Sequence, residues 1–353
     1  MKALILSGGE GSRLRPITHT QAKQLIPVAN KPILFYCLEA MRDAGIRRVG
    51  IVVGQTAPEV RAAVGDGSAW GLEVTYIPQE APLGLAHAVK ISREFIGDDP
   101  FVMYLGDNVL LEGVAGFVKE FETHRPNAQI FLARVPEPER FGVAVVEGDR
   151  AVRLVEKPKE HISDLALVGV YLFDTTVFEA VDAIRPSGRG ELEITDAIQQ
   201  LIDSGRTVRT HMVSQWWKDT GKLEDLLEAN RIMLGVLDPR VDGEVDAESS
   251  LAGSVIVEEG AKIVRSTIRG PAIVGENTVV EDSLIGPNTS IYYGCRVTSS
   301  EIENSIVMEH SVIEDVRAIA DSLIGKKVEV RRGQQRPAAY RLMLGDQSQV
   351  EVF

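Results

Sequence analysis

The C-terminal part of the chain contains a stretch whose spacing decides its fold: residues 257–285 read VEEGAKIVRSTIRGPAIVGENTVVEDSLI. Aliphatic β-branched residues recur there at every fifth or sixth position, and the spacing continues to residue 313. The repeated positions are all Val or Ile: Val257, Ile263, Ile268, Val274, Val280, Ile285, Ile291, Val297, Ile302, Val307 and Ile313. This step is typical of a hexapeptide β-helix, in which each side of a triangular coil directs one such residue inward. A run of antiparallel hairpins is the alternative.

The first two-thirds of the chain alternates strand-like and helix-like patterns. Short apolar runs predict strands at residues 3–7, 49–53, 74–77 and 101–105, and helical patterns cover residues 32–44 and 85–95. This alternation favours right-handed crossovers and a mainly parallel sheet, which binds ligands beyond the carboxyl ends of its strands. Gly8–Arg13 and Asp107 both fall at such ends.

The change of period near residue 240 predicts two domains, residues 1–239 and residues 240–353. A length of 353 residues agrees with this division at ~150 residues per domain. We expect residues 342–353 to pack back as a cap on the repeats.

The charge is acidic as a whole but unevenly distributed. The chain holds 38 Lys and Arg against 51 Asp and Glu, a net charge of −13. Residues 240–316 hold 14 acids and 5 bases, whereas residues 1–32 hold five bases and one acid. This distribution argues against a general nucleic-acid binder but allows a small anionic ligand near the N-terminus.

The sequence predicts neither a signal peptide nor a membrane span. The apolar run at residues 3–6 is too short for a signal peptide, and no stretch approaches ~20 apolar residues. Cys37 and Cys295 match no metal-binding spacing and imply no disulfide framework. We therefore expect a cytoplasmic protein that binds no membrane.

A glycine-rich loop, Gly8-Gly9-Glu10-Gly11-Ser12-Arg13, follows the first expected strand. It lacks the Gly-Lys-Ser/Thr of a Walker A loop and the third Gly of a dinucleotide fingerprint. Its glycines would let backbone N–H groups close around a phosphate, with Arg13 and Lys23 supplying charge nearby. The alternative is an ordinary strand–helix turn carrying a solvated basic loop.

Further motifs follow the loop in a fixed order. They are Lys23-Gln24-Leu25-x-Pro27-Val28, Lys31-Pro32, Gln79, residues 84–88 (GLAHA), residues 105–108 (LGDN), Glu156-Lys157-Pro158, residues 189–196 (RGELEITD) and residues 217–221 (WKDTG). Together with the glycine-rich loop they resemble the sugar-1-phosphate nucleotidyltransferases, in particular the long thymidylyltransferases that carry a left-handed β-helix tail, and the resemblance covers nearly the whole chain. The resemblance implies a Rossmann-like mixed sheet followed by the β-helix.

The resemblance also implies a reaction, Mg²⁺-dependent nucleotidyl transfer from dTTP to α-D-glucose 1-phosphate. A sugar phosphate oxygen would attack the α-phosphorus in line, giving dTDP-glucose and pyrophosphate. That phosphate has a second pKa near ~6 and is mostly dianionic at pH 7, so no general base is required. Catalysis would then depend on positioning and on neutralising charge.

The resemblance assigns roles residue by residue. Asp107 and Asp219 would hold Mg²⁺, Arg13 and Lys23 would clamp the departing phosphates, and Lys157 and Arg189 would hold the sugar phosphate. Gln79 would read the pyrimidine edge, because an amide offers both a donor and an acceptor. The expected nucleotide-binding residues are Leu6, Gly8, Gly9, Gly11, Ser12, Gln24, Gln79, Pro82 and Gly84. The expected sugar-binding residues are Asn108, Gly142, Glu156, Val168, Gly169, Tyr171 and Trp217.

Three other functions remain open from the sequence. A uridylyltransferase, or an enzyme that accepts both dTTP and UTP, would differ by one methyl contact of ~1 kcal/mol. A non-catalytic regulatory or scaffold subunit would have lost phosphate and metal ligands, which are present here. An acyltransferase site in the tail would use His310 as its base. We expect the β-helix to serve assembly into a homo-oligomer.

Overall fold

The computed structural model describes residues 1–333 and 346–351, and it divides into two compact units. The first unit contains residues 1–10, 21–25 and 33–219, and the second contains residues 11–20, 26–32 and 220–353. The domain boundary that we predict at residue 240 falls at the first strand of the β-helix, β14 (Arg240–Val241). Most of the cap predicted at residues 342–353 lies outside the described residues.

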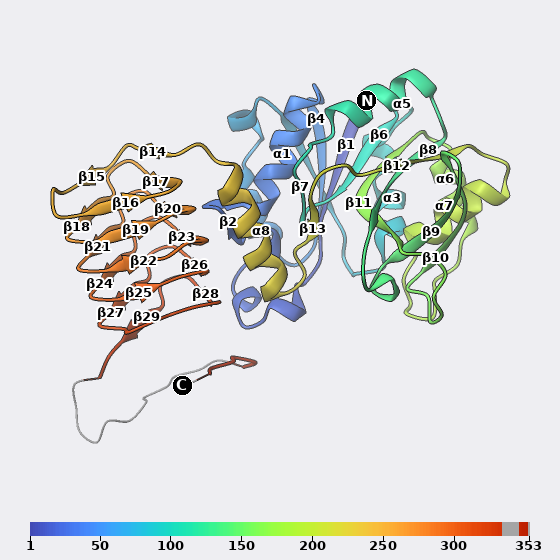
Figure 1. Cartoon of the computed structure of the whole chain (residues 1–353). Coiled ribbons are helices and arrows are strands. Elements are labelled where there is room, and N and C mark those ends of the chain that lie inside the picture. Colours follow the sequence, from blue (N-terminus) through green and yellow to red (C-terminus); the bar gives the residue numbers. More distant parts are fainter. Residues whose placement is uncertain (334–345, 352–353) are drawn as a thin grey trace. The chain divides into compact units, whose positions relative to one another are not determined.

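The first unit is built on a nine-stranded mixed sheet with the order β5-β4-β1-β6-β11-β8-β12-β10-β9 (Figure 1). Its strands are β1 (Lys2–Ser7), β4 (Arg48–Val53), β5 (Glu73–Pro78), β6 (Phe101–Leu105), β8 (Ala128–Arg134), β9 (Gly142–Glu147), β10 (Arg150–Glu156), β11 (Leu165–Phe173) and β12 (Val208–Met212). The strands β5, β4, β1 and β6 are parallel, as predicted. Beyond them β11 runs antiparallel to both β6 and β8, so the sheet is mixed, as the family resemblance implies. The mainly parallel sheet that the strand–helix alternation favours does not extend past β6.

Both faces of this sheet are buried, which explains why its first strands are unbroken apolar runs. Ala3 and Ile5 of β1 join one core, whereas Leu4 and Leu6 join the other. The helices α1 (Ile33–Asp43), α2 (Ala57–Val64) and α5 (Ala115–His124) supply the first core. The second core receives α3 (Leu85–Ile91), α6 (Val177–Ala183) and α7 (Ile194–Asp203).

The helix expected at residues 85–95 is in fact two helices. The first, α3, ends at Ile91, and α4 (Arg93–Ile96) begins after Ser92. The buried Ser92 hydroxyl donates to the carbonyl of Ala88 at 2.7 Å. A serine that bonds its own helix backbone in this way disfavours a continuous helix.

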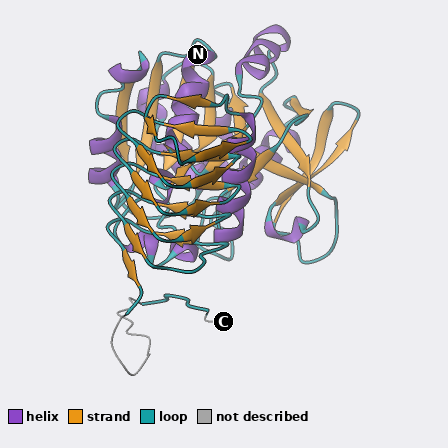
Figure 2. Ribbon diagram, turned by 60° about the vertical axis from the view of Figure 1, so that its left-hand side comes forward, coloured by secondary structure: helices purple, strands orange, loops and turns teal. Residues whose placement is uncertain are grey.

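Three parallel sheets form the β-helix of the second unit, and Figure 2 shows its coils as successive layers. One sheet contains β14, β17 (Val255–Val257), β20 (Ala272–Val274), β23 (Thr289–Ile291), β26 (Ile306–Val307) and β28 (Leu323–Ile324). The next contains β15 (Glu244–Val245), β18 (Lys262–Val264), β21 (Val279–Glu281), β24 (Arg296–Thr298), β27 (Val312–Glu314) and β29 (Glu329–Arg331). The third contains β16 (Ser250–Ala252), β19 (Thr267–Arg269), β22 (Leu284–Ile285) and β25 (Glu301–Ile302).

The spacing of the Val and Ile residues is explained by this arrangement. All of the repeated positions from Val257 to Ile313 are buried in one core. Corresponding residues of successive coils pair directly, as Ile263 does with Val280 and Val280 with Val297. The predicted β-helix is therefore confirmed, and the hairpin alternative is wrong because every strand pair in these three sheets is parallel.

Small polar residues satisfy the backbone at one corner of the coils. Ser266, Ser283 and Ser300 occupy equivalent positions, and all three are buried. The hydroxyl of Ser266 accepts from the backbone N–H of Ser283, and that of Ser283 accepts from the N–H of Ser300, at 3.0 and 3.1 Å. This ladder meets the hydrogen-bonding needs of buried backbone groups at the turns.

The helix α8 (Leu223–Val236) and the hairpin of β2 (Pro27–Val28) and β3 (Lys31–Pro32) also belong to the second unit. Asn230 of α8 is completely buried. Its Oδ1 accepts from the N–H of Ala29 at 2.8 Å and from the hydroxyl of Ser290 at 2.9 Å. One side chain therefore joins the helix, the hairpin turn and the β-helix.

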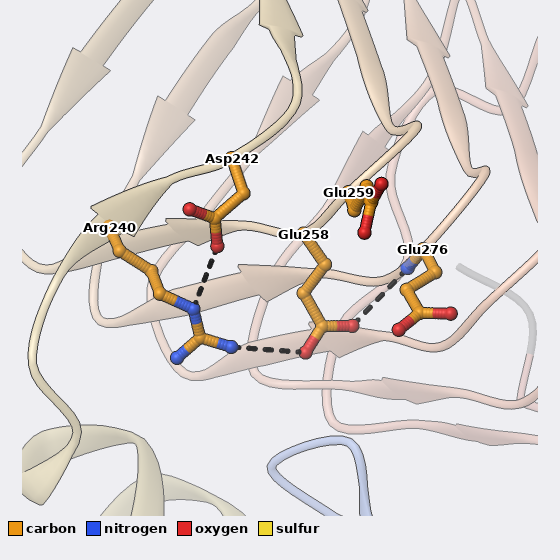
Figure 3. A pocket seen from close by; sticks show the side chains of 5 residues that line it. All are labelled: Arg240, Asp242, Glu258, Glu259 and Glu276. Carbon is orange, nitrogen blue, oxygen red and sulfur yellow. Dashed lines mark hydrogen bonds and ion pairs between the residues drawn. The ribbon is translucent and has the colours of Figure 1, made fainter.

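The acidic charge of the tail is partly gathered in a shallow hollow of about 420 Å³ at its first coils (Figure 3). Four carboxylates line it with a single arginine: Arg240, Asp242, Glu258, Glu259 and Glu276. Arg240 pairs with Asp242 at 3.0 Å, and Glu258 accepts from the backbone N–H of Glu276 at 3.2 Å. Burial is the main cause that raises the pKa of Glu258.

None of the helices within residues 1–333 and 346–351 has both the length and the hydrophobicity that a membrane span requires.

Candidate functional site

The glycine loop leaves the end of β1 where two backbones pass very close together. A Cβ on Gly54, the residue that follows β4, would lie 2.8 Å from the carbonyl oxygen of Gly8. A Cβ on Gly9 would lie 3.4 Å from Cε of Lys23. Lys23 lies on a short 3₁₀ turn (Lys23–Leu25), and its ammonium pairs with the Asp107 carboxylate just beyond β6. The fold therefore places a cation and an anion of the predicted site beside the loop.

A small antiparallel pair of strands brings Asp219, one predicted metal ligand, opposite the residue that follows the other, Asp107, in the chain. The strands are β7 (Asn108–Leu110) and β13 (Trp217–Asp219), and in their register Asp219 lies opposite Asn108. Because facing residues of such a pair are ~5 Å apart at Cβ, Asp219 is close to the neighbour of Asp107 in the chain. Asn108 and Asp219, which are more than a hundred positions apart in the sequence, thus lie opposite one another in this strand pair.

Asn108 connects these groups by hydrogen bonds. Its side chain is almost fully buried, donates to Asp107 Oδ1 at 3.0 Å and accepts from the indole N–H of Trp217 at 2.7 Å. A Cβ on Gly169 would come within 2.7 Å of the same amide. Asn108 and Trp217 thus contact one another and hold Asp107, and glycine is required at position 169 to make room for them.

The two carboxylates suit a hard divalent cation. Burial alone would raise the pKa of Asp107, but the Lys23 ammonium and the Asn108 amide hold it below its usual value, so the group is ionised. Among the described residues no three His, Cys, Asp or Glu side chains gather as a metal site. Mg²⁺ needs only one or two protein carboxylates, because substrate phosphates and water complete its shell. The donor set present here therefore fits Mg²⁺.

Gln79 follows β5 and faces the glycine loop. A Cβ on Gly8 would lie 3.1 Å from its Oε1. Its Nε2 lies 3.3 Å from the carbonyl of Gly84 and 3.0 Å from Nδ1 of His87. Gly84 has a φ of 101°, and a Cβ there would meet the Leu192 carbonyl at 2.4 Å. The contact with Leu192 within the protein therefore requires glycine at position 84. Pro82, two residues earlier, is exposed.

Other predicted nucleotide residues divide between the two units. Leu6 is buried in the sheet, with its carbonyl accepting from the N–H of Gly106. Gln24 is 1% exposed, and within the described residues its Oε1 has no hydrogen-bond partner.

Gly11, Ser12 and Arg13 belong to the second unit. Gly11 has a left-handed φ of 65° before the 3₁₀ turn Ser12–Leu14. The guanidinium of Arg13 lies against Gly221, where a Cβ would be 3.0 Å from Nη2.

A second cluster forms around Glu156 at the end of β10. Glu156 faces Gly142 across the β9–β10 pair, and a Cβ on Gly142 would be 3.0 Å from Glu156 Oε2. The hydroxyl of Thr195 donates to the same oxygen at 3.2 Å. Burial outweighs the neighbouring Lys157 and Arg189 cations and raises the pKa of Glu156.

Arg189 is held beside Glu156 by an ion pair with Glu193. Its Nη2 donates to Glu193 Oε2 at 2.8 Å and to Glu156 Oε1 at 3.1 Å. The Glu193 side chain is only 6% exposed, whereas that of Arg189 is 41% exposed. The ammonium of Lys157 lies 3.6 Å from Glu156 Oε1. Two cations thus flank one partly buried carboxylate, an arrangement suited to a ligand with both phosphate and hydroxyl groups.

Val168 and Tyr171 of β11 point into the hydrophobic core. Val168 belongs to the core with α1, and Tyr171 to the core with α3. Any contact of these residues with a sugar would come from the main chain. Burial, followed by the charge of Glu156, raises the pKa of Tyr171.

Sequence reasoning gave no role to several residues that shape these clusters. Glu193 and Thr195 lie in the quoted residues 189–196, and their burial near Glu156 depends on α7 packing against β10. His87 lies in the quoted residues 84–88, of which only Gly84 is assigned a role from the sequence. Gly54 could have been found as a glycine directly after a parallel strand, where backbones approach a ligand or one another.

Comparisons with known proteins show the family of the chain. The family model described as "Nucleotidyl transferase" matches residues 2–235. The chain is 56% identical to a glucose-1-phosphate thymidylyltransferase of Streptomyces griseus and 54% identical to one of Streptomyces antibioticus. Both alignments cover 100% of this chain and 99% of the relative.

A solved structure shows the same fold over about two-thirds of the chain. It is a Bacillus anthracis protein described as a candidate glucose-1-phosphate thymidylyltransferase, with 35% identity and a TM-score of 0.64. The match covers 68% of this chain and 98% of that one. Together with the family model and the full-length relatives, these findings show that the chain belongs to the nucleotidyl transferase family of enzymes.

Proposed function

We propose that this enzyme joins dTTP and α-D-glucose 1-phosphate to form dTDP-glucose and pyrophosphate. The observation that carries the proposal is the pairing of Lys23 with Asp107 beside Gly9, with Asp219 opposite Asn108. These groups supply the charges that an enzyme needs to bring two polyanions together. The names of the full-length Streptomyces relatives support the choice of substrates.

In the proposed reaction, an oxygen of the sugar phosphate attacks the α-phosphorus of dTTP in line. The bond from that phosphorus to the bridging oxygen of the β-phosphate breaks, and its electron pair leaves with pyrophosphate. Lys157 and Arg189 would orient the attacking phosphate, and Glu156 would accept hydrogen bonds from sugar hydroxyls. Lys23 and Arg13 would neutralise the leaving pyrophosphate. The protein thus mainly positions the reactants and offsets charge.

Asp107 and Asp219 would hold Mg²⁺. When bound, such an ion polarises phosphoryl oxygens and neutralises charge that develops during transfer. Removing divalent cations with EDTA is therefore expected to abolish pyrophosphate release, and excess Mg²⁺ to restore it. A pyrophosphate-release assay, repeated before and after chelation, measures this. An unchanged rate after complete chelation would contradict the assignment of both aspartates.

A panel of triphosphates with glucose 1-phosphate tests the nucleotide assignment. We expect dTTP and UTP both to be used, with dTTP favoured by about fivefold, because burying one methyl contributes ~1 kcal/mol. Pyrophosphate release measured with dTTP, UTP, dCTP, GTP and ATP gives the ranking. A strong preference for GTP or ATP would contradict the thymidylyl assignment. A uridylyltransferase remains the second candidate, since Gln79 faces atoms that thymine and uracil share.

We further propose that the enzyme is cytoplasmic and forms a homo-oligomer. The flat parallel sheets of the β-helix support side-by-side packing of copies. Equilibrium sedimentation of the full chain should give a multiple of 38.5 kDa, and a monomer at all concentrations would contradict assembly.

A further inference from the structure

The side-chain amide of Gln79 is anchored at its nitrogen end. Gln79 is fixed by its backbone N–H, which donates to the carbonyl of Val53 at 2.8 Å. Its Nε2 then lies 3.3 Å from the Gly84 carbonyl oxygen and 3.0 Å from His87 Nδ1, in the first turn of α3. Both neighbours are held by the fold, because Ala86 and Ala88 on either side of His87 are buried and Gly84 is packed against Leu192.

The chemistry of these neighbours settles which way the amide is turned. A carbonyl oxygen can only accept, so the group that faces Gly84 must be the NH₂ of Gln79. The second N–H of that group is directed at His87 Nδ1, which can accept only if it carries no proton. His87 must therefore be neutral, with its proton on Nε2. Burial, followed by the charge of Lys90, lowers the pKa of His87 and favours this neutral form.

The oxygen of the amide is left on the opposite side. It is the atom that lies nearest to Gly8, where a Cβ would be 3.1 Å away. Gly8 begins the glycine loop and has no side chain to cover that oxygen. Gln79 therefore presents an acceptor toward the loop, while both of its donors are already used.

We propose that His87 is a positioning residue for base selection: it holds the Gln79 amide so that a nucleobase meets only the Gln79 oxygen. Thymine and uracil have a ring N3–H that donates to this oxygen, whereas the cytosine N3 carries a lone pair that faces it unfavourably. The role rests on the proposed function and deepens it. His87 itself does not touch the base, and its effect is exerted through Gln79.

The test compares dTTP with dCTP in full-length variants of His87. Leucine is similar in size to histidine but lacks the Nδ1 acceptor. Alanine also lacks this acceptor and strongly favours a helical backbone. Asparagine keeps an acceptor oxygen near the position of Nδ1. We expect His87→Leu and His87→Ala to narrow the ratio of kcat/KM for dTTP over dCTP by about 10- to 100-fold, the cost of a hydrogen bond lost in a partly buried site. His87→Asn should keep most of the wild-type ratio. His124→Leu, the same substitution at an exposed histidine of α5, is the matched control and should leave the ratio unchanged.

The outcomes separate this role from the underlying function. Circular dichroism melting identifies any variant that fails to fold. If His87→Leu does not fold, the ratio of kcat/KM for dTTP over dCTP in His87→Ala tests the role of His87. An unchanged ratio in the folded variant, even with a lower overall rate, would overturn the role of His87 and leave the thymidylyl assignment intact. A wild-type preference for purine triphosphates would instead overturn the proposed function, and the role of His87 with it.

Discussion

Asp107→Asn is expected to reduce turnover by at least about 10²- to 10³-fold, the usual loss when one preorganised charge is removed from a reaction centre. Asn preserves the size of the side chain and its contact with Asn108 but removes the negative charge that faces Lys23. That charge is also one of the two proposed for Mg²⁺. Initial rates of pyrophosphate release at saturating dTTP and glucose 1-phosphate, measured well below the melting temperature, give the change in kcat.

Asp164→Asn is the matched control for this prediction. Asp164 also lies in the first unit and pairs with a cation, Arg134, but its side chain is 47% exposed. Surface pairs of this kind contribute at most about 1 kcal/mol, so this variant should retain the wild-type rate. If Asp107→Asn retained the rate of the control, the proposed metal and charge roles of Asp107 would have to be abandoned.

Arg189→Lys is expected to lower kcat/KM for glucose 1-phosphate by about 10- to 100-fold, because charge-assisted hydrogen bonds are each worth about 1.5–3 kcal/mol. Lysine keeps the positive charge but loses the planar fork that contacts Glu193 and Glu156 together. The KM for dTTP should change little, since Arg189 is proposed to hold only the sugar phosphate. Steady-state kinetics with each substrate varied in turn separates the two parameters.

Arg206→Lys provides the comparison for Arg189. The two arginine side chains are almost equally exposed, at 42% and 41%, and Arg206 pairs with an exposed carboxylate, Glu179. The same chemical change at Arg206 should therefore leave both KM values unchanged. A larger rise in the KM for dTTP than for glucose 1-phosphate in Arg189→Lys would place Arg189 at the nucleotide and contradict our assignment.

The parts of the fold that depend on local periodicity were predictable. The spacing of the Val and Ile residues predicted the β-helix, because each inward-facing position has the same surroundings in every coil. The unbroken apolar runs predicted the first strands. The break at Ser92 was missed because it depends on a single hydroxyl bonding the Ala88 carbonyl inside a pattern that otherwise reads as helical. The strand–helix alternation could not predict that β11 is antiparallel, because strand direction depends on where the chain returns and local patterns do not report it. Only the family resemblance implies the mixed sheet.

The candidate site was predictable in its residue types but not in its contacts. Asn108 was expected to bind sugar, yet its buried amide is engaged with Asp107 and Trp217. Trp217 reaches Asn108 only through the pairing of β7 and β13, which are separated by about a hundred residues in sequence. Long-range packing of this kind leaves no spacing signal for sequence reasoning to detect.

The register of the β-helix has a consequence for how such a tail can change in length. Ile263, Val280 and Val297 stack directly on one another, and the serine ladder repeats in step with them. Inserting or deleting one complete coil would therefore preserve every stacked column, whereas a shift of a single residue would turn buried Val and Ile toward water. Duplication of whole coils is thus a route by which the tail can lengthen during evolution while keeping its own core intact.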